Sequence, residues 1–348
     1  MKLRARKLVV GALGASGVLG MIRRHPDRSR AVILRYHSVS DWTEESSIYR
    51  EHAIAVAPAL FDRQMAFLAA HYRVVALGEL VQCLAENRPF PERAVAITFD
   101  DGYRDNFVHA LPTLRRYGLP ATVYVTTGGV GNGWQFWQAR MRAVLTRSSV
   151  PHIQVPGLGV LDLSAPEERQ RSMRRLSLLF KSLPLEDANA MLDAVGRECG
   201  VEEPVPGADT WMMSWDEMRE MVRCGVEVGA HTCSHPILTR QTSAAARDEI
   251  ERSRRVLQEG LGTVPAHFAY PNGSGVINHD ERTARLVREA GFLSAATSVN
   301  GPLRRDADRF RLHRVGVSRH SAFDGFILNL ERDRLVPRPA ARSRSSPP

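Results

Sequence analysis

Two carboxylates stand side by side at the end of an apolar run: Asp100 and Asp101 follow residues 94–99 and precede Gly102. Because Asp-Gly pairs are frequent in turns, a plain turn is one interpretation of this stretch. The other is a site in which one carboxylate holds a metal ion and its neighbour handles a proton. Adjacent side chains point in different directions, so the pair can divide these two roles.

The stretch HTCSH offers the nitrogen ligands that such a site needs, His231 and His235, directly before Pro236. Residues four apart lie on the same side of a helical turn, so both imidazoles can face one divalent ion. Two histidines and one carboxylate form a three-ligand catalytic site that leaves a position for water. Taken alone, the histidines could be exposed or capping residues after a strand, but the aspartate pair favours the metal site.

Short apolar runs alternate with helical patterns along most of the chain, which predicts an α/β fold whose parallel strands are joined by helical crossovers. The strand-like runs are 31–39, 73–77, 94–99, 121–127, 226–231, 266–270, 292–297 and 309–317. The helical patterns are 61–72, 78–87, 106–118, 215–225, 243–262 and 281–291. Between about 133 and 210 charged helical stretches lack strand partners, which predicts a helical insertion within one domain.

Titratable side chains gather at the ends of the strand-like runs. They are Tyr36 and His37, Asp100 and Asp101, His231, Tyr270, and, in the last run, His313 with Arg314. In a parallel α/β barrel the carboxyl ends of the strands form the active-site face. Turn chemistry alone would not collect titratable groups at one end, so this shared position supports a catalytic site.

The net charge of +9 belongs to the two ends of the chain. Residues 1–30 hold eight Lys or Arg against a single Asp, a net +7, and residues 331–348 hold five Arg against two acidic residues, a net +3, so residues 31–330 sum to −1. A nucleic-acid-binding fold is therefore not supported, and no nucleic acid is expected as a partner. Four cysteines without CxxC spacing argue against a disulfide scaffold.

Residues 1–30 are predicted to be a basic and apolar leader or a membrane anchor. Between two basic stretches lie fifteen apolar or small residues, which would span roughly 22 Å as a helix, short of a bilayer core. A surface anchor, a secretory signal and a disordered leader all stay open. We expect a membrane-associated or cell-envelope location, with a cytoplasmic one as the alternative, and a basic disordered tail over 331–348.

The motifs TFDDG at 98–102 and HTCSH at 231–235 together make the sequence similar to the polysaccharide deacetylase family, also called the NodB-homology domain or carbohydrate esterase family 4. Further segments occur in the family's usual order: ILRYHSVSD, FDRQMAFL, LPATVYVTTG, SWDEM, GAHTCSHPIL and FAYPNG. The resemblance covers residues 31–320 or so. It implies a distorted parallel (β/α) barrel of the NodB-homology type at 31–330, with the insertion at about 133–210.

The resemblance also implies roles for single residues. Three residues would bind a divalent metal ion, taken as zinc although other divalent ions stay open: Asp101, His231 and His235. Asp100 would be the general base that deprotonates the metal-bound water, which attacks the acetamide carbonyl. A backbone N–H near Asn272 would meet the oxyanion. The residues expected to contact the substrate are Tyr270, Pro271 and Asn272.

The motif FAYPNG departs from the family pattern. Many relatives carry an Arg before a Pro–Tyr pair, and that Arg orients the base, whereas this chain has Ala269 near the same place. We hypothesise that Arg314 reaches Asp100 instead. The family's last motif supplies a His as general acid, for which His313 is the candidate and His37 a substitute.

These features predict a metal-dependent hydrolase that removes N-acetyl, or O-acetyl, groups from an acetylated polysaccharide or amino sugar. A deacylase or deformylase of a lipid-linked amino sugar is one alternative, and the basic, apolar N-terminus favours a membrane-bound substrate. A non-catalytic carbohydrate-binding relative is another, although a pure binder has no need of the base Asp100. A hydrolase of a non-sugar amide and the oligomeric state also stay open. An aromatic group in the insertion could stack on sugar rings or pack locally: Trp134, Phe136 and Trp137.

Overall fold

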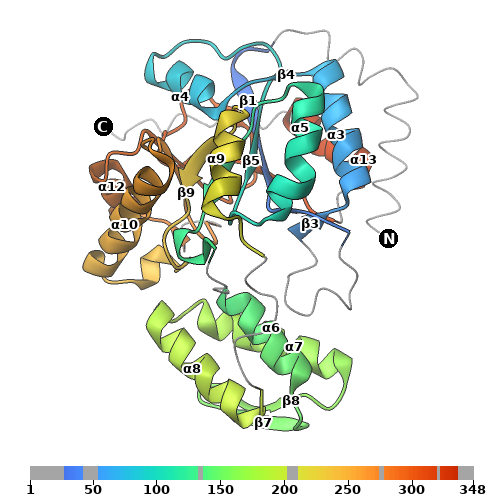
Figure 1. The fold of residues 1–348 in the computed structure, drawn as a ribbon, viewed down its shortest axis with the longest axis vertical. Helices are drawn as coiled ribbons and strands as arrows, with labels where there is room; N and C mark the ends of the chain where they lie inside the picture. The colour runs from blue at the N-terminus through green and yellow to red at the C-terminus, as the bar shows by residue number, and fades with distance from the viewer. Residues whose placement is uncertain are drawn as a thin grey trace, which may run out of the picture.

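The computed structural model describes residues 27–41, 54–131, 136–201, 211–273, 278–319 and 322–335. Its body is a curled, mostly parallel sheet wrapped by helices, and a smaller lobe lies beneath it (Figure 1). The predicted α/β fold, a distorted parallel barrel, is therefore confirmed. The main sheet consists of β1 (Arg30–Tyr36), β4 (Arg73–Val74), β5 (Ala94–Phe99), β6 (Thr122–Val125), β9 (Glu227–Ala230), β10 (His267–Ala269), β11 (Ser294–Ala296), β12 (Leu303–Arg304) and β13 (Val315–Gly316).

Helices cover the outside of this sheet. They are α3 (Pro58–His71), α4 (Leu77–Ala85), the π-helical turn η2 (Asn106–Ala110) with α5 (Leu111–Tyr117), α9 (Trp215–Arg223), α10 (Ser243–Leu261), α12 (Glu281–Glu289) and α13 (Phe323–Leu335). Two short 3₁₀ turns, η3 (Thr127–Gly129) and η5 (Leu238–Arg240), and a small parallel pair, β2 (Ser38–Val39) with β3 (Ala55–Val56), complete the body. Because helices cover β5, all six of its residues are buried, as its unbroken apolar sequence requires.

The sheet follows the order β11-β10-β9-β6-β5-β1-β12, with β4 beside β5 and β13 beside β1. Among the described residues of this sheet, β1 pairs with β12 in antiparallel fashion and all other strand pairs are parallel. The chain around β13 curls the sheet towards closure, because Leu312 bridges to Ala296 of β11 while Val315 pairs with Leu34 of β1. Residue 314 therefore lies in the seam between the two ends of the parallel sheet.

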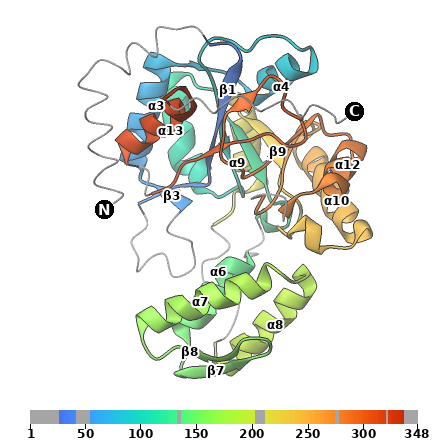
Figure 2. The ribbon, with the colours of Figure 1, turned by 180° about the vertical axis from the view of Figure 1, so that it is seen from behind.

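The lobe is built from residues 137–201 around an apolar core of its own. It contains α6 (Trp137–Arg147), β7 (His152–Val155), β8 (Gly159–Asp162), α7 (Pro166–Phe180) and α8 (Leu185–Glu198). The predicted helical insertion also contains an antiparallel hairpin, β7–β8, which lies at the end of the lobe away from the sheet (Figure 2). Buried and exposed residues alternate along β7, and glycines 157 and 159 supply the positive φ angles of the turn.

The C-terminal helix α13 corrects part of the expected tail. It extends to Leu335, so the first residues of 331–348 are helical, and the carboxylate of Glu331 is buried, where it accepts a hydrogen bond from the Tyr72 hydroxyl. The helix packs on α3, with the Phe323 and Phe67 rings 5.6 Å apart. Apolar residues 326 and 330, four apart, are buried and explain this docking.

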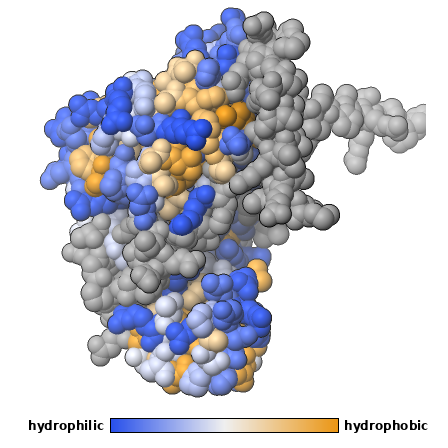
Figure 3. Space-filling model, turned by 90° about the vertical axis from the view of Figure 1, so that its right-hand side faces the viewer, coloured by the Kyte–Doolittle hydropathy of each residue, from blue (hydrophilic) through white to orange (hydrophobic). Residues whose placement is uncertain are grey.

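Residues 1–26 and 336–348 lie outside the part of the chain that the structure describes, so the leader, the anchor and the rest of the tail stay predictions. On the face that carries α3 and α13, apolar side chains gather among hydrophilic ones (Figure 3). Among the residues described, no helix combines the length and the apolar character needed to cross a membrane.

Candidate active site

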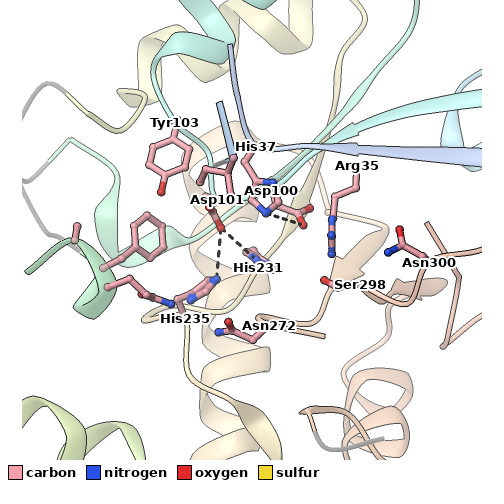
Figure 4. A pocket seen from close by; sticks show the side chains of 14 residues that line it. Arg35, His37, Asp100, Asp101, Tyr103, His231, His235, Asn272, Ser298 and Asn300 are labelled. Carbon is pink, nitrogen blue, oxygen red and sulfur yellow. Dashed lines mark ion pairs between the residues drawn. The ribbon is translucent and has the colours of Figure 1, made fainter. Parts of the chain in front are cut away.

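A pocket of about 420 Å³ opens where several parallel strands end (Figure 4). His37 follows β1, Asp100 and Asp101 follow β5, His231 follows β9, and Asn272 lies shortly after β10; all of them line the pocket. The sheet therefore brings together titratable residues that are up to about 200 positions apart in the sequence.

Three of these side chains form a compact ligand set. The Oδ1 atom of Asp101 lies 3.4 Å from the Nε2 atoms of both His231 and His235, and the possible ligand atoms of all three lie within 4.8 Å of one another. The Nδ1 atom of His231 lies 2.7 Å from the carbonyl oxygen of Ala269. If Nδ1 carries the proton, Nε2 is free to bind a metal. Two imidazole nitrogens and one carboxylate oxygen suit a divalent ion such as zinc, so the residues fit a metal centre.

The loop that carries the two histidines is held in place from outside the pocket. The carboxylate of Glu249 in α10 accepts hydrogen bonds from the backbone N–H groups of Cys233 (2.8 Å) and Ser234 (3.0 Å). On the other side, the N–H of Gly128 donates to the carbonyl oxygen of Cys233 at 2.8 Å. A Cβ atom at Gly128 would lie 2.5 Å from that oxygen, so this contact requires glycine. The Cys233 side chain is buried, and it does not belong to the ligand set of Asp101, His231 and His235.

Several pocket residues occupy the left-handed region of backbone conformation, which favours glycine. The φ angles are 78° at Asp101, 59° at His235 and 52° at Asn272. Each such residue costs on the order of 1 kcal/mol or more, and it persists only where the surrounding structure enforces it. Strain is therefore concentrated where the ligand set is assembled.

The second carboxylate, Asp100, is bound by Arg314. Nη1 and Nη2 of Arg314 donate to the two oxygens of Asp100 at 2.6 and 2.8 Å, and Nε donates to the carbonyl oxygen of Thr297 at 2.8 Å. Arg314 is completely buried at the seam of the sheet. The contact that the Arg314 hypothesis requires is present, and it is bidentate, the strongest form of this pair.

The surroundings keep Asp100 ionised. Burial alone would raise its pKa, but Arg314, together with His231 and His37, outweighs burial and lowers the pKa to about 2. The pKa of Asp101 is also lowered although burial opposes this, because the imidazoles of His231 and His235 face its carboxylate. Both adjacent carboxylates are thus charged at neutral pH, one facing a guanidinium and the other facing two imidazoles.

His37 approaches the same carboxylate from β1. Its Nε2 atom lies 3.9 Å from Oδ2 of Asp100. Burial lowers the pKa of His37 to about 4 against the opposing charges of Asp101 and Asp100, so the imidazole is neutral at pH 7. The pocket thus combines a metal-ligand set, a fixed carboxylate and a neutral imidazole.

The sequence comparison decides the family. The family model for polysaccharide deacetylases matches residues 87–148 and 184–295, half of the chain. The chain belongs to the polysaccharide deacetylase family. It is a hydrolase that acts on the carbon–nitrogen bond of acetylated carbohydrate, in a family that generally depends on a metal ion. The matched residues include Asp100, Asp101, His231 and His235.

The deacetylase is similar to curated proteins and to solved structures of polysaccharide deacetylases. It is 21% identical to YxkH of Bacillus subtilis over 86% of this chain and 76% of that protein. It is 30% identical to the poly-β-1,6-N-acetyl-D-glucosamine N-deacetylase of Staphylococcus epidermidis over 30% of this chain and 39% of that protein. Among solved structures, the Streptococcus pyogenes deacetylase PplD matches with a TM-score of 0.58 and 18% identity over 88% of this chain and all of that one. IcaB of Ammonifex degensii matches with a TM-score of 0.57 and 21% identity over 87% and 97%. Both structures show the same fold.

Two expected roles do not match where the structure of the deacetylase places the residues. His313 is exposed and does not line the pocket, whereas the next residue, Arg314, is completely buried. Successive side chains of an extended segment point to opposite sides, so His313 points outward where Arg314 points inward to Asp100. His37, the substitute, is the histidine that lies beside Asp100.

Of the three residues expected to contact the substrate, only Asn272 lines the pocket. Tyr270 is fully buried, its hydroxyl donates to the carbonyl oxygen of Phe310 at 3.0 Å, and its ring stacks on His279. Pro271 is buried as well and does not line the pocket. The sequence showed that these residues follow a strand but not that Tyr270 turns towards the helical layer.

Sequence reasoning missed several residues that line the deacetylase pocket. They are Arg35, Ile54, Tyr103, Gln138, Ala139, Ser298 and Asn300. A signal existed for Arg35, because it interrupts an apolar strand two positions before His37, and residues two apart share one face of a strand. Phe136 also lines the pocket, with its ring 5.0 Å from that of His235 and 5.7 Å from that of Tyr103. This aromatic residue therefore packs beside a metal-ligand candidate as well as facing the pocket.

Proposed function

We propose that this deacetylase hydrolyses the N-acetyl group of an amino sugar, with Asp100 as the general base. Asp101, His231 and His235 would hold a zinc ion. The observation that supports this assignment is that two adjacent carboxylates have different partners. One faces two imidazoles at 3.4 Å, and the other is held by Arg314, next to the ligand set.

A divalent ion at the three ligands would polarise the acetamide carbonyl and lower the pKa of a water molecule. The water oxygen forms a bond to the carbonyl carbon, the C–N bond breaks, and acetate and a free amine result. Asp100 accepts the proton that the water loses. Because its pKa is about 2, Asp100 holds that proton only briefly and passes it on. Arg314 acts as a positioning residue that fixes both oxygens of the base.

We assign the protonation of the leaving nitrogen to His37. A neutral imidazole must gain a proton before it can act as an acid, and the protonated Asp100 at 3.9 Å is a source within reach of a small movement. His313 is not assigned this role because it is exposed outside the pocket. The Nδ2 group of Asn272, buried without an acceptor in the described structure, is placed to donate to the substrate.

A polymeric substrate outside the cytoplasm fits this proposal best. Curated relatives act on poly-β-1,6-N-acetyl-D-glucosamine, by their names. The basic and apolar residues 1–30 support a location at a membrane surface in the cell envelope. Sedimentation of the full chain, and of the chain without residues 1–30, with anionic lipid vesicles tests that location.

Acetate release tests the proposed reaction. The purified protein is incubated with acetylated amino-sugar oligomers and with a lipid-linked acetylated amino sugar, with chelator, with zinc restored, and as Asp100→Asn. We expect release that stops with chelator, returns with zinc, and falls by at least about 10²-fold in Asp100→Asn while the bound metal is retained. Absence of release from all substrates by the zinc-loaded protein would contradict the proposal and favour a carbohydrate-binding role.

A further inference from the structure

One side of the pocket is lined by hydrogen-bond donors that the proposed reaction does not use. Arg35 of β1 lies there with Ser298 and Asn300, which follow β11, on the side away from Tyr103 (Figure 4). Among the residues described, the Arg35 side chain has no hydrogen bond or ion pair, and its Nε atom is buried without an acceptor. This guanidinium is therefore available to a ligand.

Asn300 is oriented by the backbone beside Arg35. The N–H of Gly316 donates to Oδ1 of Asn300 at 3.0 Å, which occupies the amide oxygen and leaves the NH₂ group for a ligand. A Cβ atom at Gly316 would lie 3.0 Å from Nη2 of Arg35 and 3.6 Å from Oδ1 of Asn300. The side chains of Arg35 and Asn300 therefore both lie next to Gly316, and a larger residue at 316 would displace Arg35.

Arg35 lies close enough to Asp100 and Asp101 for their charges to act on it, but it forms no ion pair with either carboxylate among the residues described. Asp100 is already paired with Arg314, and Asp101 faces the two histidines. Arg35 keeps its charge at neutral pH, since burial, the largest influence, lowers its pKa only to about 10. Arg35 and Arg314 offset the two carboxylates, so a divalent ion at the ligand set would leave an excess of positive charge that an anionic substrate group would balance.

We propose that Arg35, Ser298 and Asn300 bind an oxyanion, a carboxylate or a phosphate, that the substrate carries near its acetamide. Arg35 and the NH₂ group of Asn300 only donate, the Ser298 hydroxyl can donate as well, and the planar guanidinium of Arg suits two oxygens of one anionic group. The inference rests on the proposed function and commits to an amino sugar, free or within a polymer, that carries a carboxylate or a phosphate. This substrate differs from the neutral poly-β-1,6-N-acetyl-D-glucosamine named for the curated relatives. A neutral amino sugar would offer the Arg35 guanidinium no anionic acceptor.

Paired substrates test this subsite. Acetate release by the zinc-loaded protein is measured with N-acetylglucosamine and with three anionic partners: its 1-phosphate, its 6-phosphate and N-acetylmuramic acid. We expect kcat/KM for at least one anionic sugar to exceed that for the neutral sugar by about 10-fold or more. The preferred partner tells whether a carboxylate or a phosphate, and at which position, fits the subsite.

Two variants test whether a preference for anionic sugars depends on Arg35 and Asn300. Arg35→Gln removes the charge, and Asn300→Asp, of the same shape, adds a carboxylate next to Arg35. In both, the ratio of kcat/KM for the anionic sugar to that for the neutral sugar should fall by about 10-fold. Arg304→Gln removes an exposed charge near the opposite end of β1 and should leave the ratio unchanged.

Binding separates this inference from the proposed function. Calorimetric titration of zinc-loaded Asp100→Asn with the same four sugars reports affinity without turnover. If no sugar releases acetate but the anionic one still binds more tightly through Arg35, the proposed function fails and the subsite stands. Equal kcat/KM and equal affinity for all four sugars would overturn the subsite. So would an Arg35→Gln variant that loses activity equally on both kinds of substrate, because Arg35 would then act on the base.

Discussion

The pocket of the barrel and the core of the lobe are built on opposite principles. The pocket gathers buried charges, a bidentate Arg314–Asp100 pair and residues with positive φ angles. The lobe packs leucines such as Leu176 and Leu192 around one apolar core, and its ion pairs are at least partly exposed. Of the lobe, residues Gln138 and Ala139 line the pocket, together with Phe136 directly before it. The difference indicates that the barrel carries the chemistry and the lobe shapes one side of the entrance.

Removing a metal-ligand candidate should have the largest effect and would test the barrel side of this comparison. His235→Ala deletes one of three ligands, so we expect the zinc content of the purified protein to fall well below stoichiometric and kcat/KM to fall at least about 10³-fold. Metal analysis and acetate release measure both quantities. Gln138→Ala, at the lobe side of the same pocket, serves as the control and should keep the metal. Full metal content in His235→Ala would show that the ligand set is wrongly assigned.

Replacing the positioning residue should have the next largest effect. Arg314→Lys keeps the charge but cannot bind both oxygens of Asp100, so we expect kcat to fall about 10²-fold. The acid limb of the pH–kcat profile should move to higher pH, because Arg314 no longer holds the pKa of Asp100 as low. A variant whose profile keeps its shape while kcat falls would show a structural role only. Arg304→Lys, on the exposed surface, should change neither quantity.

Much of the barrel, and several of the residues that line its pocket, could be predicted from the sequence. Apolar runs such as 94–99 are long enough to specify buried strands, and the rule that functional residues follow parallel strands brought Asp100 and His231 together. The position of Gly118 also marked the end of a helix, where its φ angle is 62°. These features depend on local pattern and on one topological rule.

Two features could not be predicted from the sequence: the direction in which single side chains point, and the way the segment around β13 joins the two ends of the sheet. A motif spelled LHRVG does not say which of His313 and Arg314 faces inward, because that depends on how the segment pairs with β1 and β11. The same uncertainty applied to Tyr270. The hairpin β7–β8 was missed because its strands are short and lie between charged helices. Arg35 was missed because a single polar residue in an apolar strand can equally be a surface position.

The pH dependence of stability should distinguish the partly buried imidazole of His37 in the barrel from an exposed one in the lobe. Burial lowers the pKa of folded His37 to about 4, while the unfolded chain takes up this proton near 6.5. Between these values the unfolded state binds more protons, so stability falls as pH decreases from about 6.5 to 4. His37 should account for about 3 kcal/mol of that loss.

Urea unfolding of the metal-free protein between pH 7.5 and 4.5 measures this loss. His235, His267 and His279 shift in the same direction, so the informative quantity is the difference between wild type and His37→Gln. The variant should lose less stability on acidification than the wild type does. His152→Gln, whose side chain is 58% exposed in the lobe, is the matched control and should follow the wild type. Identical pH dependence in all three proteins would mean that His37 is not buried as a neutral imidazole.

A core substitution in the lobe should have the smallest effect on catalysis. Leu176 is completely buried there, so Leu176→Ala should destabilise the lobe by about 2–5 kcal/mol. Because the ligand set and Asp100 belong to the barrel, we expect full zinc content and a kcat within about twofold of wild type at 15 °C. Leu178→Ala, in the same helix but 71% exposed, should change neither stability nor kcat.

The outcome of this last experiment decides how separate the two regions are. If Leu176→Ala lowers the unfolding temperature of one transition and leaves a second one in place, the lobe unfolds on its own and the barrel does not depend on it. If zinc content and kcat fall together with the stability of the lobe, the two regions form one cooperative unit. The contacts of Phe136 with His235 and Tyr103 would then be the route by which the lobe holds a ligand of the barrel in place.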